Sequence, residues 1–204
     1  TTIPRAAISG SNSDRRRGLV ARLKDFIRDA GFNEAINYSF MNEAYCETFC
    51  MHEHDRRRKA LPIKNPLRKE ESLLRTTLIP ALTDVFLYNF ARGVKEIRVF
   101  EEAKVFEDIG RPLPLEISRI GGICYKEKIP SLWKDDAKDF YLVKGVIESL
   151  FEEFHIKGYS FSSSQEPFLH PGQSCDIRIN GMNIGFLGLL SPVVISKLDI
   201  KATK

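Results

Sequence analysis

The sequence has no long hydrophobic run, few cysteines and no large excess of one charge, and each absence excludes a class of protein. No apolar stretch in the 204 residues approaches the roughly 18 that a membrane-spanning helix needs, and the first residues lack the apolar core of a secretory signal. Four cysteines are few for a disulfide scaffold, so we expect reduced thiols and a cytoplasmic location. With 31 basic and 27 acidic residues, the charge balance permits a nucleic-acid face but does not indicate one.

Motifs of nucleophilic, phosphate and metal chemistry are also missing. There is no Gly-x-Ser-x-Gly, and Gly185-x-x-Gly188 lacks the lysine and the helix start of a phosphate-binding loop. We interpret these glycines as strand positions where a neighbour packs closely. One cluster has the spacing of half a zinc site, but a second cluster on a separate element is absent, so we predict no metal. That cluster is Cys46, Cys50, His52 and His54.

The sequence that is present alternates helices and strands. Residues 1–13 are polar and predict a linker or the tail of a preceding domain. Residues 14–204 predict one core domain, whose last helix is cut short by the end of the sequence. Apolar residues at helical spacing predict three long helices, over 14–30, 77–92 and 139–155, and two short ones, over 42–50 and 192–198.

Strands are predicted between these helices. Ile36, Tyr38 and Phe40 alternate with polar residues and predict a half-buried strand with these three side chains inward. Residues 95–106 and 116–125 predict a hairpin, and Asn180-Gly181 predicts a tight turn between the last two strands. The further predicted strands are 61–64, 159–163, 174–179 and 182–190. The order predicts an α+β domain with a mostly antiparallel sheet and helices on one face.

Single residues punctuate these elements. Gly31 and Gly93 suit positions just after a helix, where φ is positive. Thr76 or Thr77 can cap the second long helix, with Pro80 in its first turn. Gly145 costs its helix about 1 kcal/mol relative to Ala, which predicts close packing against a neighbour.

Several arginines and one histidine are candidates for function. Convergent arginines can bind phosphates as bidentate donors, but ion-paired or surface arginines are the simpler interpretation. The same holds for the basic runs 15–17 and 56–59, which lack interleaved aromatics and predict solvated faces. His170, two residues before Gly172, predicts a loop histidine that hydrogen-bonds the backbone. The arginines are Arg75, Arg92, Arg98, Arg111 and Arg119.

A series of motifs, in order and spacing, resembles a known family. The chain is similar to the central, synthetase-like domain of the beta subunit of bacterial phenylalanyl-tRNA synthetase, over nearly its whole length. Ser191-Pro192 departs from the His-Pro that this family often carries. The motifs are Gly31-Phe32-Asn33-Glu34, Tyr38-Ser39-Phe40, Asn65-Pro66-Leu67, Leu74-Arg75-Thr76-Thr77-Leu78-Ile79-Pro80, Val99-Phe100-Glu101, Lys104-Val105-Phe106, Asp139-Phe140, Lys144-Gly145, Glu148, Leu169-His170-Pro171-Gly172 and Ile184-Gly185-Phe186-Leu187-Gly188.

The resemblance implies the fold of class II aminoacyl-tRNA synthetases, an antiparallel sheet flanked by helices. It also implies a non-catalytic domain. The third-motif helix offers no arginine for ATP, and Glu101 and Glu102 stand on the second-motif strand, where two acids would repel a triphosphate. ATP and Mg are then expected in the alpha subunit, and no cofactor in this domain.

The resemblance further implies partners and residue roles. The partners are the alpha subunit, in a heterotetramer of two alpha and two beta chains, and tRNA(Phe) through the complex. The first helix would form the subunit interface, with Val20, Ala21 and Ile27 at the edge of an exposed apolar strip. Structural roles are predicted for Arg75 and Thr76, which fix the start of the second long helix, and for His170 and Gly172.

Two other functions stay open. One is a degenerate adenylate-forming enzyme that uses Arg98 or Arg111. The other is an independent RNA-binding module that uses the basic runs, whose affinity would fall steeply with salt.

Overall fold

The computed structural model describes residues 13–66, 68–127 and 139–200. The predicted linker therefore lies outside the described residues, except for Ser13, which begins the first helix. The helices are α1 (Ser13–Asp29), α2 (Ala44–Thr48), α3 (Ile79–Phe90), α4 (Asp139–Glu153) and α5 (Pro192–Lys197). The strands are β1 (Asn33–Glu34), β2 (Phe40–Met41), β3 (Leu73–Leu74), β4 (Glu96–Glu107), β5 (Leu115–Lys126), β6 (Tyr159–Ser163), β7 (Leu169–Ile179) and β8 (Met182–Leu190).

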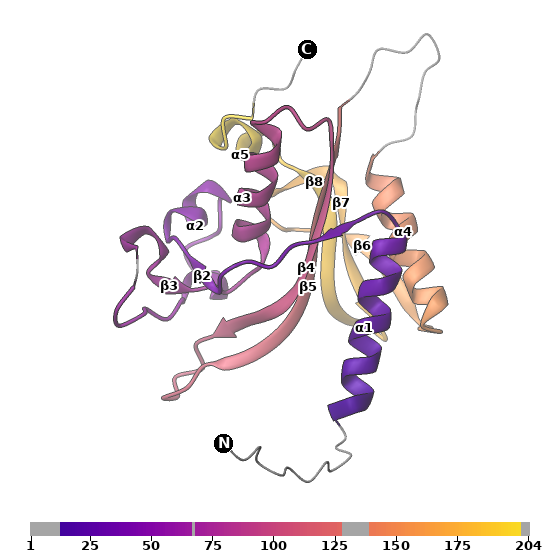
Figure 1. Cartoon of the computed structure of the whole chain (residues 1–204), viewed down its shortest axis with the longest axis horizontal. Coiled ribbons are helices and arrows are strands. Elements are labelled where there is room, and N and C mark those ends of the chain that lie inside the picture. Colours follow the sequence, from indigo (N-terminus) through magenta and orange to yellow (C-terminus); the bar gives the residue numbers. More distant parts are fainter. Residues whose placement is uncertain (1–12, 67, 128–138, 201–204) are drawn as a thin grey trace, which may run out of the picture.

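The strands form a mostly antiparallel arrangement, as the sequence predicts (Figure 1). Hydrogen bonding groups the described strands into three sheets, in the orders β1-β4-β5, β2-β3 and β6-β7-β8. Only β1 and β4 run parallel among these pairs. The predicted hairpin of β4 and β5 is confirmed, and its register runs from Glu96 opposite Lys126 to Glu107 opposite Leu115.

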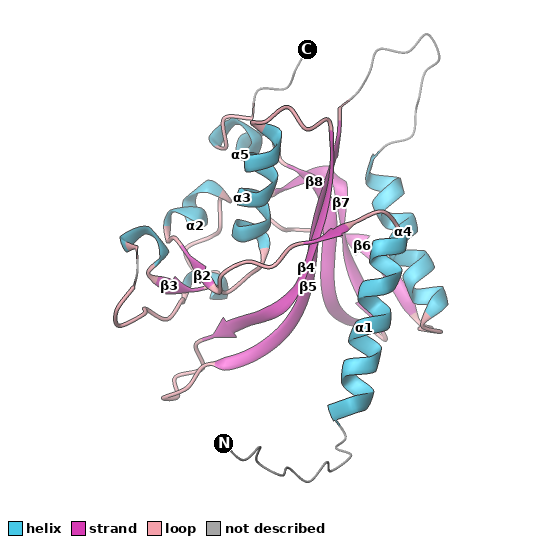
Figure 2. Ribbon diagram, viewed as in Figure 1, coloured by secondary structure: helices cyan, strands magenta, loops and turns pink. Residues whose placement is uncertain are grey.

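Helices lie on both sides of the strands, so the prediction of helices on one face is wrong (Figure 2). Leu187 of β8 packs in the cluster that contains Phe151 of α4. Its neighbour Phe186 packs in the cluster that contains Val194 of α5. Successive strand residues point to opposite faces, and here both are apolar, so each face takes its own helices.

The third core cluster joins α3 to the β4–β5 hairpin. Leu82 and Phe86 of α3 are buried against Ile97 and Val99 of β4. Gly121 of β5 lets α3 approach, because a Cβ atom there would lie 3.2 Å from Leu82 Cδ1. This contact sets the distance between helix and hairpin.

Turns and helix ends follow their predicted residues. Asn180 and Gly181 have φ of 50° and 81°, the positive values that a two-residue type I′ hairpin needs. Gly31 and Gly93, with φ of 87° and 76°, stand just beyond α1 and α3. The side chain of Ser191 caps α5 by accepting a hydrogen bond from the Val194 N–H.

Three local predictions are wrong. A Cβ added at Gly145 would meet nothing within 4 Å, so no neighbour explains this helical glycine. Residues 61–64 form only an isolated bridge, between Pro62 and Leu73. The last helix is not cut short, because α5 ends at Lys197. After this end, the Ile200 N–H donates a hydrogen bond to the Ile195 carbonyl at 3.2 Å.

The half-buried strand predicted before β2 is also wrong. Only Asn33–Glu34 and Phe40–Met41 pair as strands. Ile36 and Tyr38, predicted to be inward, are 92% and 77% exposed. Within the described ranges, no helix combines the length and apolar content needed to cross a bilayer.

Candidate functional site

A buried ion pair lies at the centre of the segment that runs from β3 to β4. Arg75, just after β3, and Glu101 of β4 are each 2% exposed, and their Nη1 and Oε1 atoms are 2.9 Å apart. The apolar run around Glu101 makes β4 a core strand, and the pair supplies the opposite charge that this buried carboxylate requires.

Arg75 also joins three chain segments through hydrogen bonds. Its Nε donates to the Lys104 carbonyl at 2.9 Å and its Nη1 to the Tyr38 carbonyl at 3.4 Å. Its own N–H donates to the Ser39 carbonyl, and its carbonyl accepts from the Phe106 N–H. These bonds tie β4 and the segment before β2 to the chain that leads into α3, which supports the structural role expected for Arg75.

Asn37 satisfies the remaining acceptor of Glu101. Its Nδ2 donates to Oε2 at 2.9 Å, and its backbone N–H donates to Oε1 at 3.3 Å. Both carboxylate oxygens are therefore occupied within the chain. The charges of Arg75 and Glu101 neutralise each other, and neither is offered to a phosphate.

Glu102 lies on the opposite face of β4, because consecutive strand residues alternate. Its Oε2 is 3.5 Å from Lys24 Nζ of α1, and Lys24 also bonds Glu34 at 2.7 Å. The bond to Glu34 raises the pKa of Lys24. The expectation that Glu101 and Glu102 together face an approaching triphosphate is wrong, since they point to different sides.

Thr76 fixes a loop and does not cap the helix. Its hydroxyl donates to the Arg57 carbonyl at 2.6 Å, whereas the Ile79 N–H at the start of α3 donates to the Thr77 hydroxyl. Arg57 in turn pairs with Asp55 at 2.6 Å and with Glu166 at 2.7 Å. The basic run 56–59, predicted as a solvated face, is thus partly built into the fold.

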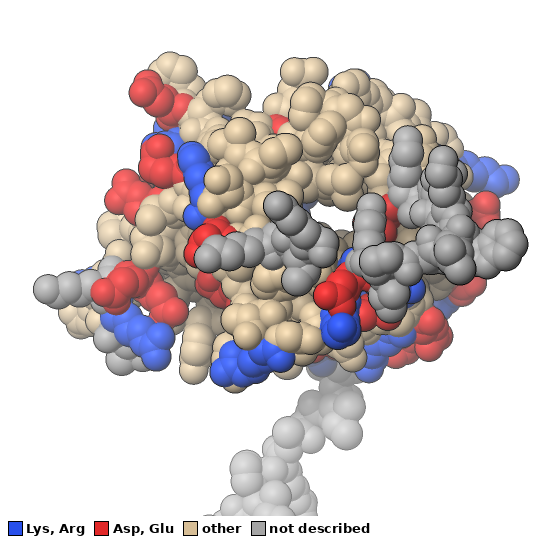
Figure 3. Space-filling view, turned by 90° about the horizontal axis from the view of Figure 1, so that it is seen from above, with Lys and Arg blue, Asp and Glu red and all other residues tan. Residues whose placement is uncertain are grey.

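The other arginines have separate surroundings. Arg98 Nη2 lies 2.8 Å from Glu96, Arg92 stacks over the ring of Tyr88, and Arg111 is exposed in the turn between β4 and β5. On the face shown in Figure 3, basic and acidic side chains lie side by side among the coloured residues. Neither a phosphate clamp nor a uniformly basic surface is built from the described residues in view.

His170 and the cysteines have local surroundings. His170 lies in β7 and not in a loop, and its Nδ1 accepts the Gly172 N–H at 3.1 Å. Cys46 is buried, which raises the pKa of its thiol, and Cys50 Sγ lies 3.3 Å from Lys197 Nζ. In the described parts of the chain, no three His, Cys, Asp or Glu side chains are grouped to hold a metal ion.

The residues predicted for a subunit interface divide into two groups. Val20 is half-buried and Ala21 is exposed, so both can lie at the edge of a contact. Ile27 is only 9% exposed and belongs to the core of its own domain, which corrects its assignment. Leu19 is apolar and 54% exposed, which makes it a further candidate for the edge of a contact.

Comparison with known proteins gives the same relationship as the motifs. Residues 1–203 match the family described as the phenylalanyl tRNA synthetase beta chain CLM domain. The chain belongs to this family. Curated relatives named phenylalanine–tRNA ligase beta subunit include that of Syntrophus aciditrophicus (strain SB), 36% identical over 98% of this chain, and that of Geobacter sulfurreducens, 33% identical over 98%. The chain covers only 25% and 26% of these relatives, so it spans about a quarter of their length.

Proposed function

We propose that this chain is a non-catalytic assembly domain of a phenylalanine–tRNA ligase. It holds the catalytic alpha subunit in a cytoplasmic complex of two alpha and two beta chains, and tRNA(Phe) binds through that complex. ATP and Mg act in the alpha subunit, and this domain takes no cofactor. The relatives are named phenylalanine–tRNA ligase beta subunit, and this name supplies the class of complex.

The buried Arg75–Glu101 pair is the observation that carries the non-catalytic role. A phosphate site needs arginine N–H groups that are free to meet the ligand. Here the Arg75 side chain is 3% exposed, and its guanidinium is bonded to a carboxylate and two carbonyls. Arg75 therefore stabilises the fold.

The arrangement of strands supports the class II fold that the resemblance implies. β1 follows the long helix α1 and pairs with β4, β4 and β5 form a long hairpin, and β8 leads into α5. These correspond in order to the three motifs of that class. An exposed strip on α1 fits the interface role of the first motif.

The test is assembly with an alpha subunit. Mixing the two purified chains should give a complex whose mass, measured by light scattering, exceeds that of either chain alone. Leu19→Ser should weaken assembly, whereas Leu113→Ser, 78% exposed in the β4–β5 turn, should not. Failure to assemble would refute the proposal.

Calorimetry checks the absence of catalysis. The chain alone should give no heat with ATP and no ATP–pyrophosphate exchange with phenylalanine. Exchange activity would instead establish the degenerate-enzyme alternative.

A further inference from the structure

The thiol of Cys50 lies against the amine of Lys197, although 147 positions separate the two residues in the chain. Cys50 lies just beyond α2, and Lys197 is the last residue of α5. The Cys50 Sγ and Lys197 Nζ atoms are 3.3 Å apart. Reacting atoms that stand about 3–3.5 Å apart are within the range from which a bond can form. The pair is therefore placed for chemistry between a sulfur and a nitrogen.

One backbone oxygen positions both groups of this pair. The Glu47 carbonyl accepts the Cys50 N–H at 3.2 Å and Lys197 Nζ at 2.5 Å. The Glu47 carboxylate is bonded to Arg58, so Lys197 bonds the backbone of Glu47 while its side chain is occupied. The Cys50 backbone has a φ of 53° and turns the chain at the end of α2. Sulfur and amine are thus held side by side.

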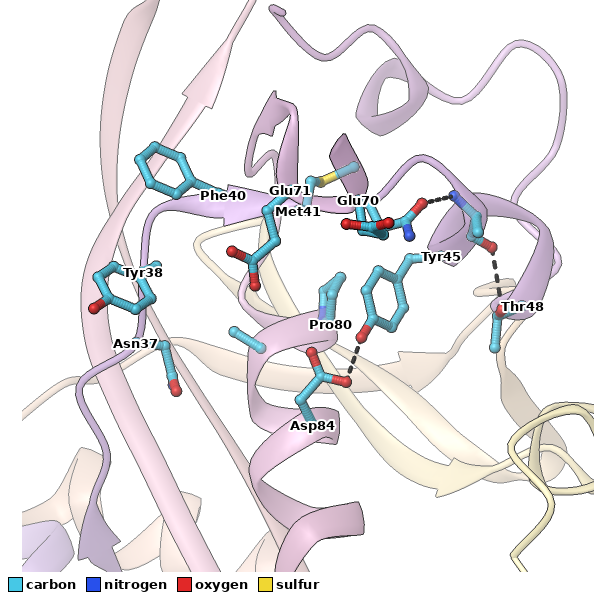
Figure 4. Close-up of a pocket in the computed structure, with 13 residues that line it drawn as sticks. Asn37, Tyr38, Phe40, Met41, Tyr45, Thr48, Glu70, Glu71, Pro80 and Asp84 are labelled. Atoms are coloured by element: carbon cyan, nitrogen blue, oxygen red, sulfur yellow. Dashed lines mark hydrogen bonds between the residues drawn. The ribbon is translucent and has the colours of Figure 1, made fainter. Parts of the chain in front are cut away.

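The elements that carry the pair are packed into one core. Tyr45 of α2 donates a hydrogen bond to Asp84 of α3, in the wall of a cavity of about 340 Å³ (Figure 4). Phe49, next to Cys50, and Val194 of α5 are both fully buried in the same apolar cluster. Since both elements are anchored in this way, the contact between Cys50 and Lys197 belongs to the folded structure.

The surroundings of the four cysteines favour Cys50 as the reactive thiol. Cys46 and Cys175 are buried, and Cys124 is half-buried, as Cys50 is. Burial raises the pKa of the thiols of Cys46, Cys124 and Cys175, which disfavours the thiolate that peroxide oxidises. Reactive cysteines are typically partly exposed and next to a positive group. Cys50, with Lys197 in contact, has both properties.

We propose that Cys50 and Lys197 form an oxidation site, where hydrogen peroxide converts their contact into a covalent S–N cross-link. First, the thiol sulfur takes one oxygen from peroxide and becomes a sulfenic acid, and water is released. The neutral amine of Lys197 then attacks this sulfur. An S–N bond forms, the S–O bond breaks, and the hydroxyl leaves as water with one amine hydrogen. Overall, one peroxide is reduced to two waters, and the thiol and the amine each lose a hydrogen.

The cross-link fastens the end of α2 to the end of α5. It closes a loop over most of the described chain, which restricts the unfolded state and stabilises the fold. A thiol reductant reverses it by attacking the sulfur and releasing the amine, and a second thiol then reduces the mixed disulfide. The site is therefore a reversible switch between a locked, oxidised form and an open, reduced form, and it does not depend on the proposed function.

Peptide mass spectrometry of the full chain tests the cross-link. The chain is treated with hydrogen peroxide, the excess is removed with catalase, free thiols are alkylated, and the product is digested with trypsin. The peptides that contain Cys50 and Lys197 should appear joined, with their summed mass less two hydrogens, and fragmentation should place the bond at Cys50. Oxidation should raise the melting temperature by about 5–15 °C, and dithiothreitol should reverse both changes.

Variants separate the two steps. Lys197→Met should prevent the cross-link and leave Cys50 as a sulfenic acid that dimedone traps, whereas Cys50→Ser should give neither product. Matched controls are Lys157→Met, which removes an exposed lysine elsewhere, and Cys124→Ser, which removes the other half-buried thiol. Both controls should cross-link as fully as the wild-type chain. Melting curves recorded before oxidation verify that each variant folds.

Three outcomes would overturn the proposal. One is oxidation of Cys46, Cys124 or Cys175 before Cys50. Another is a wild-type chain whose Cys50 is oxidised while the Lys197 amine stays free. The third is an equal rise in melting temperature for Lys197→Met, which would assign the stabilisation to a different oxidation product.

Discussion

A charge removed from water decides the role of Arg75. An arginine beside a core strand suits phosphate binding as well as an ion pair, and the two roles differ in which group faces the guanidinium. Glu101 faces it here at 2.9 Å, with both partners buried. Because a buried charge without its counterion is strongly unfavourable, the residues are expected to be energetically coupled.

The energetic coupling between Arg75 and Glu101 can be measured with a double-mutant cycle. Arg75→Met should destabilise the fold by about 3–5 kcal/mol, because it leaves Glu101 buried and unpaired. The double variant Arg75→Met/Glu101→Gln should lose less than the sum of the two single variants. Urea unfolding of the four proteins of this cycle measures the difference.

An exposed pair provides the control for this cycle. Arg22 and Glu153 lie 3.3 Å apart with side chains 62% and 53% exposed, and the matching variants should change stability by less than about 1 kcal/mol. A loss of less than 1 kcal/mol for Arg75→Met would contradict the structural role.

At the scale of elements, helix propensity accounts for a weak point in α4. Gly145 stands in the interior of this helix, and a Cβ there would meet nothing within 4 Å. The glycine therefore carries its full entropic cost without a packing benefit. The chain offers the opposite case at Gly93, whose φ of 76° ends the turn after α3.

We predict that Gly145→Ala raises the free energy of unfolding by up to about 1 kcal/mol. Gly93→Ala should lower it by about 1 kcal/mol or more, because a side chain disfavours positive φ. Thermal or urea unfolding distinguishes the two signs. A destabilised Gly145→Ala would reveal a contact at this helix face that the isolated chain does not show.

At the scale of the whole molecule, one ion-paired cluster joins distant segments and should respond to acid. Arg57 links Asp55, in the loop after α2, to Glu166, which lies between β6 and β7. The hydrogen bond from Arg57 lowers the pKa of Asp55. A carboxylate with a lowered folded-state pKa stabilises the fold above its unfolded value of about 4 and loses this contribution as the pH falls through the folded value.

The lowered pKa of Asp55 predicts how the stability of the fold depends on pH. Asp55→Asn should destabilise the chain by about 1.5–3 kcal/mol at pH 7, the range for a hydrogen bond to a charged group. The difference from wild type should shrink as the pH falls below about 4. Urea midpoints at pH 7, 5, 4 and 3 measure this. A difference that stays constant down to pH 3 would show that the charge of Asp55 does not matter.

Sequence patterns and tertiary structure determined different features of the site. The motif series identified the family, and apolar spacing located the long helices and the β4–β5 hairpin to within a few residues. The sequence did not predict the cavity that Glu70, Glu71 and Asp84 help to line. These acids come from separate segments of the sequence and share no motif. Ile27 was expected at the edge of an exposed strip but is buried, whereas Leu19 is 54% exposed, because spacing defines the buried stripe of a helix only to within part of a turn.

By itself, the sequence determined the family, the order of the elements and which residues share a side of each strand. Only the tertiary structure decided which side meets the core. A period of two places Ile36, Tyr38 and Phe40 together, but the same period allows the whole set to face either way. Here Asn37 points inward and bonds Glu101, which Arg75 neutralises, so Ile36 and Tyr38 face outward and Phe40 is half-buried.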